Sequence, residues 1–364
     1  MQVAEPNHEA ARVLAVCNAC RYCEQYCPAF QALEQRLTFA SADVSYLANL
    51  CHGCGECLYA CQYAPPHELA INVPQTLAAA RVVSYEQYAW PAVLAGAFRK
   101  QSVGTALLLA LAFTVVLLGA TLALNGGALN APAAAGDFYA VIPHAALVAL
   151  FGGVGLFVLV ALTIGVARCR RDFAATAMPA AARRGSGGLA SALHDAFTLR
   201  HLHVAGADCT TALEVRTPWR RRMHHLTVYG FALCFASTCV AALYHLLGSP
   251  APYAYASLPV LLGATGGVGL TVGTAGLMWL RRARDRALSQ ASDERLDGAF
   301  ATLLLLTGIT GLLLLALREH AAMGVVLIVH LGIVLALFVT LPYGKFVHGL
   351  YRLAALMKYR REQD

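Results

Sequence analysis

Charged residues are scarce in this chain of 364 residues. Asp, Glu, Lys and Arg together make up 13% of it, 58% is hydrophobic, and the mean hydropathy is +0.57. Soluble domains carry about a quarter charged residues, so most of this chain is expected to face lipid. The formal charge of +7 does not indicate a nucleic-acid partner, because the arginines stand beside apolar segments.

Several familiar motifs are also missing. We find no P-loop, no nicotinamide-binding fingerprint and no nucleophile–base pair. The stretch "GATGGVGLTVGTAG" at 263–276 lies in an apolar run with no strand before it, so it predicts close helix packing and not a dinucleotide loop. The first 20 residues lack the basic flank and apolar core of a signal peptide, which predicts that the N-terminal segment stays in the cytoplasm.

Six apolar runs are long enough to cross a bilayer, which takes about 20 helical residues. They contain no Asp, Glu or Arg, whereas an ion-coupled solute carrier would be expected to place such groups within its spans. The last run is predicted to continue past Pro342 with a kink, and Lys345 to snorkel near its inner end. The predicted spans are 102–124, 140–166, 225–247, 258–280, 299–317 and 323–349.

Lysine and arginine are distributed unevenly among the connectors. The connectors 125–138 and 248–257 contain none, whereas 167–223 contains ten and 281–297 contains five. With the N-terminal segment and the residues after Leu341 included, one side of the membrane receives 26 of the 27 basic residues. By the positive-inside rule, this asymmetry predicts a multi-pass protein of a bacterial-type inner membrane with both termini in the cytoplasm.

The connector 167–223 has three parts. "AATAMPAAARRGSGG" is predicted to be a flexible bend, and "GLASALHDAFTLRHL" a short helix on the membrane surface. "TPWRRRMHH" leads into the third span with Trp219 at the interface. The surface helix is either an anchor or part of a docking face for a partner.

Eight cysteines form two matching runs, "CNACRYCEQYCP" at 17–28 and "CHGCGECLYAC" at 51–61. Each run reads C-x2-C-x2-C-x3-C, and in two-cluster ferredoxins the fourth cysteine of such a run binds the other cluster. Pro28 completes the first motif, while Gln62 stands where proline usually follows the second. The predicted ligands are Cys17, Cys20, Cys23 and Cys61 for one [4Fe–4S] cluster, and Cys51, Cys54, Cys57 and Cys27 for the other.

Zinc and disulfides are the alternatives for these cysteines. Structural zinc generally takes two separated C-x2-C pairs, and disulfides are rare in the cytoplasm. The segment between the runs has helical spacing and no β-type alternation, which predicts an all-helical ferredoxin-like domain. Cys169, Cys209, Cys234 and Cys239 have no comparable spacing.

Histidines are the main ionisable residues of the apolar spans, and such residues are functional candidates. His224 and His225 lie at the inner end of the third span and His245 at its outer end. His330 lies in the outer part of the sixth span and His348 at its inner end. At 100° per residue, His330 and His348 share a face; His224 is about 60° from His245, whereas His225 is about 160° away.

The third and sixth spans run in opposite directions, which sets His348 opposite His224 and His330 opposite His245. Two facing bis-His pairs would suit two b-type haems, separated by roughly 27–31 Å of helix. The alternative is a structural role for some of these histidines. We expect one or two haems, with His225 as the alternative to His224. His144 and His320, near the outer surface, are predicted to be structural or close to a quinone.

These motifs resemble the tricarballylate (citrate) utilisation protein B family of membrane iron–sulfur proteins, over nearly the whole chain. The final stretch is also similar to the last helix of the respiratory nitrate reductase cytochrome b subunit, where His330 and His348 match the haem-ligating positions. The stretches that carry the resemblance are "CHGCGECLYACQYAPPHELAINVP", "HHLTVYGFALCFAST", "APYAYASLPVLLGATGGVG" and "HLGIVLALFVTLPYGKFVHGLYR".

The resemblance implies a partner FAD-dependent dehydrogenase that oxidises tricarballylate. This protein would reoxidise the partner's FADH2 and pass electrons through two [4Fe–4S] clusters and haem b to the membrane quinone pool. The same chain of redox cofactors could serve a different electron donor, such as a heterodisulfide- or sulfur-type reductase or another dicarboxylate dehydrogenase. The substrate chemistry is in either case expected in the partner.

The predicted fold class is therefore an all-α membrane protein. An α-helical ferredoxin-like domain with two [4Fe–4S] clusters precedes a six-helix transmembrane bundle of the cytochrome b type. The predicted parts are 1–100 (iron–sulfur domain), 101–167 (spans one and two), 168–223 (cytoplasmic connector), 224–352 (spans three to six) and 353–364 (cytoplasmic tail).

Overall fold

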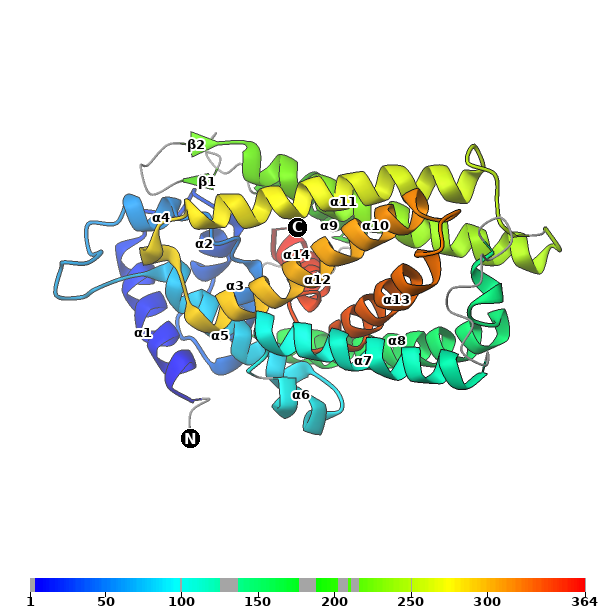
Figure 1. Cartoon of the computed structure of the whole chain (residues 1–364). Helices are drawn as coiled ribbons and strands as arrows, with labels where there is room; N and C mark the ends of the chain where they lie inside the picture. The colour runs from blue at the N-terminus through cyan, green and yellow to red at the C-terminus, as the bar shows by residue number, and fades with distance from the viewer. Residues whose placement is uncertain are drawn as a thin grey trace.

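The chain is almost entirely helical in the part that the computed structural model describes. Those residues are 4–98, 100–124, 137–176, 188–201, 209–210, 216–249 and 251–363. Two two-residue strands, β1 (Cys209–Thr210) and β2 (Arg216–Thr217), pair antiparallel. The N-terminal helices gather at one end of an elongated bundle whose long helices run toward the other end (Figure 1). The all-α prediction is confirmed.

The N-terminal region is built from short helices joined by the cysteine loops. Pro28 opens α2 where no backbone N–H is needed, and the Asn72 side chain accepts a hydrogen bond from the Gln75 amide at 3.2 Å to cap α5. Helix α5 packs against α1 and α3. The bounds are α1 Ala4–Cys20, α2 Pro28–Leu33, α3 Ser41–Leu50, α4 Glu56–Tyr59, α5 Val73–Tyr88 and α6 Ala92–Phe98.

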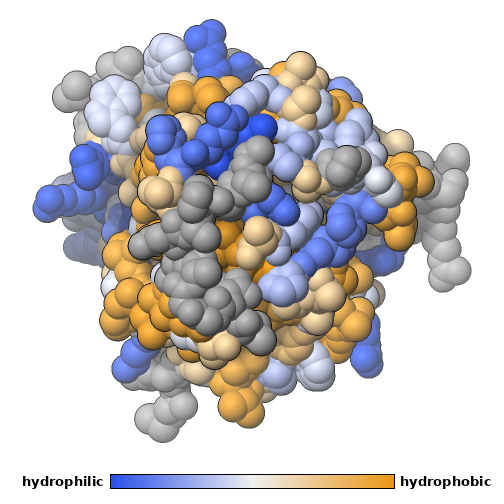
Figure 2. All heavy atoms as spheres, turned by 45° about the vertical axis from the view of Figure 1, so that its right-hand side comes forward, coloured by the Kyte–Doolittle hydropathy of each residue, from blue (hydrophilic) through white to orange (hydrophobic). Residues whose placement is uncertain are grey.

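Six helices are long and apolar enough to cross a membrane, as the sequence predicts. Several extend past the predicted spans, because a helix can continue with polar residues where hydropathy falls. Large hydrophobic side chains on these helices reach the surface, where lipid would cover them (Figure 2). They are α7 Val103–Leu124, α8 His144–Ala175, α10 Trp219–Leu246, α11 Leu258–Arg282, α12 Ala291–Ala316 and α13 Met323–Thr340. The remaining elements are α9 Gly188–Thr198, α14 Val347–Gln363 and the 3₁₀ turns η2 Phe138–Ala140 and η4 Arg286–Leu288.

The predicted sixth span, 323–349, is wrong in one respect. Helix α13 ends at Thr340, and α14 begins at Val347 after an irregular segment. Pro342 has no N–H to continue the helical ladder, and Gly344 folds its amide back onto the Thr340 carbonyl at 2.9 Å. His330 and His348 therefore lie on different helices, and the helical-wheel relation predicted between them does not apply.

Residues 353–363 of the predicted cytoplasmic tail belong to α14, and six of these eleven residues are buried. Glu362 is 5% exposed, and its carboxylate accepts hydrogen bonds from Arg36 at 2.5 Å and from Tyr46 at 2.8 Å. Arg36 also pairs with Asp43 at 2.9 Å. Helix α14 thus packs against the N-terminal helices α2 and α3.

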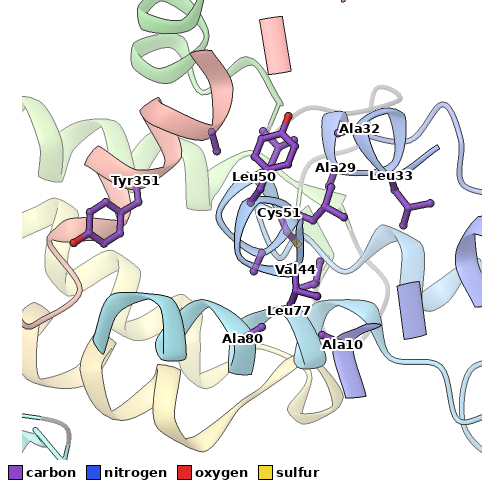
Figure 3. Close-up of a cluster of buried hydrophobic side chains, with 14 of the residues drawn as sticks. Ala10, Ala29, Ala32, Leu33, Val44, Leu50, Cys51, Leu77, Ala80 and Tyr351 are labelled. Carbon is purple, nitrogen blue, oxygen red and sulfur yellow. The ribbon is translucent and has the colours of Figure 1, made fainter. Parts of the chain in front are cut away.

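One hydrophobic core joins these parts. It contains residues of α1, α2, α3 and α5, the inner end of α8, and α14. Figure 3 shows part of it, including Ala10, Val44, Leu77 and Ala80 where α1, α3 and α5 meet. The cysteine-bearing region is therefore packed against the adjacent ends of the long apolar helices.

Helices α10 and α11 approach each other closely through glycine, as the glycine-rich run predicts. A Cβ on Gly230 would lie 2.3 Å from the Leu270 amide nitrogen, and one on Gly273 would lie 2.5 Å from that of Thr227. These neighbours are backbone atoms that cannot turn aside. The contact between α10 and α11 fixes α10, and with it the histidines that α10 carries.

Gly230→Ala is expected to destabilise the protein by about 1–3 kcal/mol or more, because the methyl group must push two helix backbones apart. Thermal unfolding of the purified protein in detergent measures this. Gly119→Ala in α7 is the matched control, since nothing lies within 4 Å of its added Cβ. Equal stability of the two variants would show that the α10–α11 contact is looser than the structure has it.

Candidate electron-transfer site

The four thiols predicted for the first cluster line one cavity, which Cys57 of the second run also lines. Cys17 and Cys20 lie in the last turn of α1, Cys23 follows in a turn, and Cys61 comes directly after α4. The cavity has a volume of about 220 Å³ and is closed on its apolar side by residues such as Phe30. Burial and the thiols of Cys61, Cys23 and Cys20 raise the pKa of Cys17 to about 12. Four thiolates this close would repel one another, so a bound metal cation would favour their deprotonation.

The four thiols predicted for the second cluster also lie together. Cys51 ends α3, Cys57 lies in α4, and Cys27 precedes α2. Burial and the nearby thiols of Cys54 and Cys51 raise the pKa of Cys27. The pKa of Cys57 is raised by burial and by the other three. The amides of residues 29 and 30 donate to the Cys27 sulfur, a contact common around iron–sulfur clusters.

The thiols thus group in the crossed pattern, with the fourth cysteine of each run beside the first three of the other. The eleven cysteines whose side chains are described are free of disulfides. Within the described residues, no three Cys, His, Asp or Glu side chains converge closely enough to hold a single metal ion.

Gly53 and Gly55 shape the loop that carries Cys54. Their φ angles are +60° and +95°, a conformation that glycine adopts without strain. A Cβ at Gly55 would also lie 2.8 Å from the Leu288 side chain. The loop is therefore folded against the connector between α11 and α12, next to the membrane helices.

His224 of α10 and His348 of α14 face each other at the inner end of the bundle. Their ring centroids lie 6.1 Å apart and their planes are at 88°. Two imidazoles that bind one iron from opposite sides at about 2 Å each have centroids roughly 6 Å apart. The spacing fits a bis-His haem.

The hydrogen bonds of His348 and His224 leave a ring nitrogen of each free to bind iron. His348 Nδ1 donates to the Lys345 carbonyl at 2.6 Å, which leaves the lone pair on Nε2, the arrangement usual for metal-bound histidine. Burial and the nearby cations Arg352 and Lys345 lower the pKa of His348, so that it is neutral. His224 Nδ1 is buried without a hydrogen-bond partner. Both rings can therefore donate a lone pair to iron.

His225, the alternative to His224, is turned elsewhere. Its Nε2 lies 3.1 Å from the Phe197 carbonyl of α9, and its ring packs on Tyr229. The structure thus presents His224, and not His225, to His348.

The predicted outer pair, His245 with His330, is not brought together. The His245 ring stacks on His144 with a centroid distance of 3.6 Å, and Tyr139 packs against both. His330 is buried in α13, where its Nδ1 bonds the Thr310 hydroxyl at 2.8 Å. His330 lies seven residues after Met323, the first residue of α13, which is about 10 Å along the helix. His245 lies in the last turn of α10, at its very end. This difference in depth is why the pair fails.

Helix α14 connects the histidine pair to the second group of thiols. One turn after His348 it carries Arg352, whose Nη2 donates to the Cys51 carbonyl at 2.7 Å. Sequence reasoning missed Arg352, and Arg81 of α5, which donates to the same carbonyl at 3.0 Å. The one feature of the sequence that could have pointed to Arg352 and Arg81 is that each is an arginine within an otherwise apolar helical stretch.

A helical domain with two four-thiol groups, packed on six membrane-type helices and a buried histidine pair, defines a membrane-associated iron–sulfur electron-transfer protein. Family models agree: "Citrate utilization protein B Fer4-like domain" matches residues 10–87 and "Citrate utilization protein B" matches 99–364. The chain belongs to the citrate utilization protein B family. It is 48% identical over 364 residues to citrate utilization protein B of Escherichia coli, covering 99% of this chain and 94% of that protein. No solved structure matches it significantly.

Proposed function

We propose that this protein reoxidises the FADH2 of a partner tricarballylate dehydrogenase and delivers the electrons to membrane quinone. The two thiol groups would hold two [4Fe–4S] clusters, and His224 and His348 one haem b. Bound there, these groups supply one-electron carriers between a two-electron flavin donor and a quinone acceptor. One haem is proposed, because one histidine pair has the spacing for it.

The observation that carries this proposal is the adjacency of the two sites. The carbonyl of Cys51, a thiol of the second group, is bonded to the residue one turn after His348. Thiol ligand and imidazole ligand are thus joined through one hydrogen bond and one turn of α14. The chain's own residues hold each carrier, exclude water from the histidine pair, and keep the carriers at fixed separation.

Iron and haem analysis of the purified protein, with EPR and optical spectra, tests the proposal. We expect eight irons, one haem with a low-spin spectrum, and reduction of the haem by the flavoprotein with its acid substrate. A protein that holds zinc, or that carries no haem, would contradict it. Reduction by a sulfur-type donor, but not by the flavoprotein, would support the other donor class.

The proposed orientation places both termini in the cytoplasm. A reporter that is active only outside the cytoplasm is expected to work when fused after Pro252, between α10 and α11, and to fail at the C-terminus. The basic residues around α14 hold that end inside. The reverse activity at either fusion would mean that the bundle is inverted or that one predicted crossing is not made. A further fusion point, Asn130, lies outside the described residues.

A further inference from the structure

Four arginines converge on the loop that carries the second thiol group. Arg81 and Arg352 both donate to the Cys51 carbonyl, at 3.0 and 2.7 Å. Arg220 and Arg284 both donate to the Gly53 carbonyl, at 3.4 and 3.1 Å. They come from four places in the chain: α5, α14, α10 and the connector after α11. We call these four residues the arginine cluster.

The charge of Arg81 and Arg352 is not cancelled by a direct ion pair within the described residues. Arg81 is 6% exposed, and its Nε donates to the Ala48 carbonyl at 2.9 Å. The carboxylates nearest to it, Asp293 and Asp297, are instead bonded to Lys345 at 2.6 and 2.9 Å. Positive charge is therefore concentrated beside Cys51, in a region of low dielectric.

The first thiol group has a different electrostatic setting. Arg21, in the turn between Cys20 and Cys23, is exposed and donates to the Asn18 carbonyl at 3.2 Å. The acidic residues Glu24 and Glu34 lie close to Arg21. Tyr22, which lines the cavity of this group, is 65% exposed. The first group is thus nearer to solvent and less positive than the second.

Reduction adds one negative charge to a cluster, so nearby buried cations stabilise the reduced form and raise the reduction potential. We infer that the arginine cluster makes the cluster held by Cys51, Cys54, Cys57 and Cys27 the higher-potential of the two. This inference rests on the proposed function. With clusters bound, the thiols of Cys51, Cys54, Cys57 and Cys27 would then hold the better electron acceptor of the two, on the side of the molecule where α14 carries His348.

Arg352 acts as a positioning residue in this scheme. Its side chain joins the loop of Cys51 to the helix that carries His348, so it holds these two parts of the molecule at a fixed separation. The order of the carriers would then be donor, first cluster, second cluster, haem.

The test is an EPR-monitored redox titration of the full-length protein in detergent, in wild type, Arg81→Gln, Arg352→Gln and Arg352→Lys. Cys20→Ser and Cys54→Ser assign the two cluster signals. In each Gln variant, the ratio of reduced to oxidised second cluster at fixed potential is expected to fall about tenfold, which is 59 mV for a one-electron couple. The first cluster should be unchanged, and Arg352→Lys should retain most of the wild-type ratio.

Arg12→Gln is the matched control. Arg12 also donates to a backbone carbonyl, that of Leu69, at 3.3 Å, but it pairs with Glu9 on the exposed side of α1. Its loss should leave both potentials unchanged. If the Arg352→Gln protein loses iron, the potential of the second cluster can still be compared between wild type, Arg352→Lys and Arg81→Gln.

Two outcomes would overturn the inference: a second cluster of lower potential than the first in wild type, or Gln variants whose two clusters shift equally or not at all. These differ from failure of the proposed function, which would appear as a wild-type protein without two clusters. A merely structural role for Arg352 would reduce iron content without moving the potential of the remaining clusters.

Discussion

Purified His348→Ala protein is expected to contain almost no haem. His348 and His224 would together hold the haem iron, so removing one imidazole would remove half of the protein's ligands to it. Even the loss of an outer partner of a metal-bound histidine weakens binding roughly 10–100-fold, so loss of the ligand itself should exceed tenfold. Any residual haem should be high-spin. His224→Ala should behave in the same way.

The controls come from the neighbouring histidines. His225→Ala should retain haem with a normal reduced α-band, because its ring bonds the Phe197 carbonyl and not His348. His330→Ala and His245→Ala should also retain it, since neither ring lies in the pair. Haem per protein and the α-band of these five variants settle the assignment. Loss of haem in His225→Ala with retention in His224→Ala would require α10 to be rotated from its position here.

The second large effect is expected from the crossed cysteines. Cys61→Ala should abolish the cluster bound mainly by the first run, and Cys27→Ala the one bound mainly by the second. Each variant is expected to keep about half of the iron of wild type, since the other cube retains its four thiolates. Cys169→Ala is the control, because that buried thiol lies in α8 apart from both groups.

Assignment by EPR distinguishes crossed from uncrossed binding. If Cys61→Ala removed the same signal as Cys54→Ser, each run would bind its own cluster. In either variant, haem reduction by the donor is expected to stop, because the proposed order of carriers passes through both thiol groups before His348. Normal haem reduction in both variants would place the electron entry elsewhere in the molecule.

The sequence predicts the periodic and motif-based parts of this protein well. Helicity, the six apolar spans and a helical cysteine domain follow from local composition and spacing, and the structure confirms them. The facing of His224 and His348 was predicted from antiparallel spans, and the structure places the rings 6.1 Å apart. These features depend on residues near one another in the chain or on simple helix geometry.

The break before α14 was not predicted, because hydropathy reports how apolar a segment is and not whether its helix continues. "LPYGKFVHGLYR" stays apolar enough to look like one span. The predicted pairing of His245 with His330 is not found for a related reason. Two paired histidines must lie at the same depth in the bundle, and the spacing of residues along one helix does not fix the depth of a residue on another helix. The arginine cluster could not be recognised from the sequence, because its hydrogen-bond partners are backbone carbonyls. Every residue has such a carbonyl, so no residue type marks the site.

The ion pair between Arg36 and Glu362 has a consequence for how the protein is made. Arg36 is synthesised early, but its partner is on α14, after all six membrane helices in the chain. Until α14 is made, Arg36 has Asp43 as a partner but lacks the carboxylate that completes the network of the finished fold. The region that leaves the ribosome first is thus the last to finish folding.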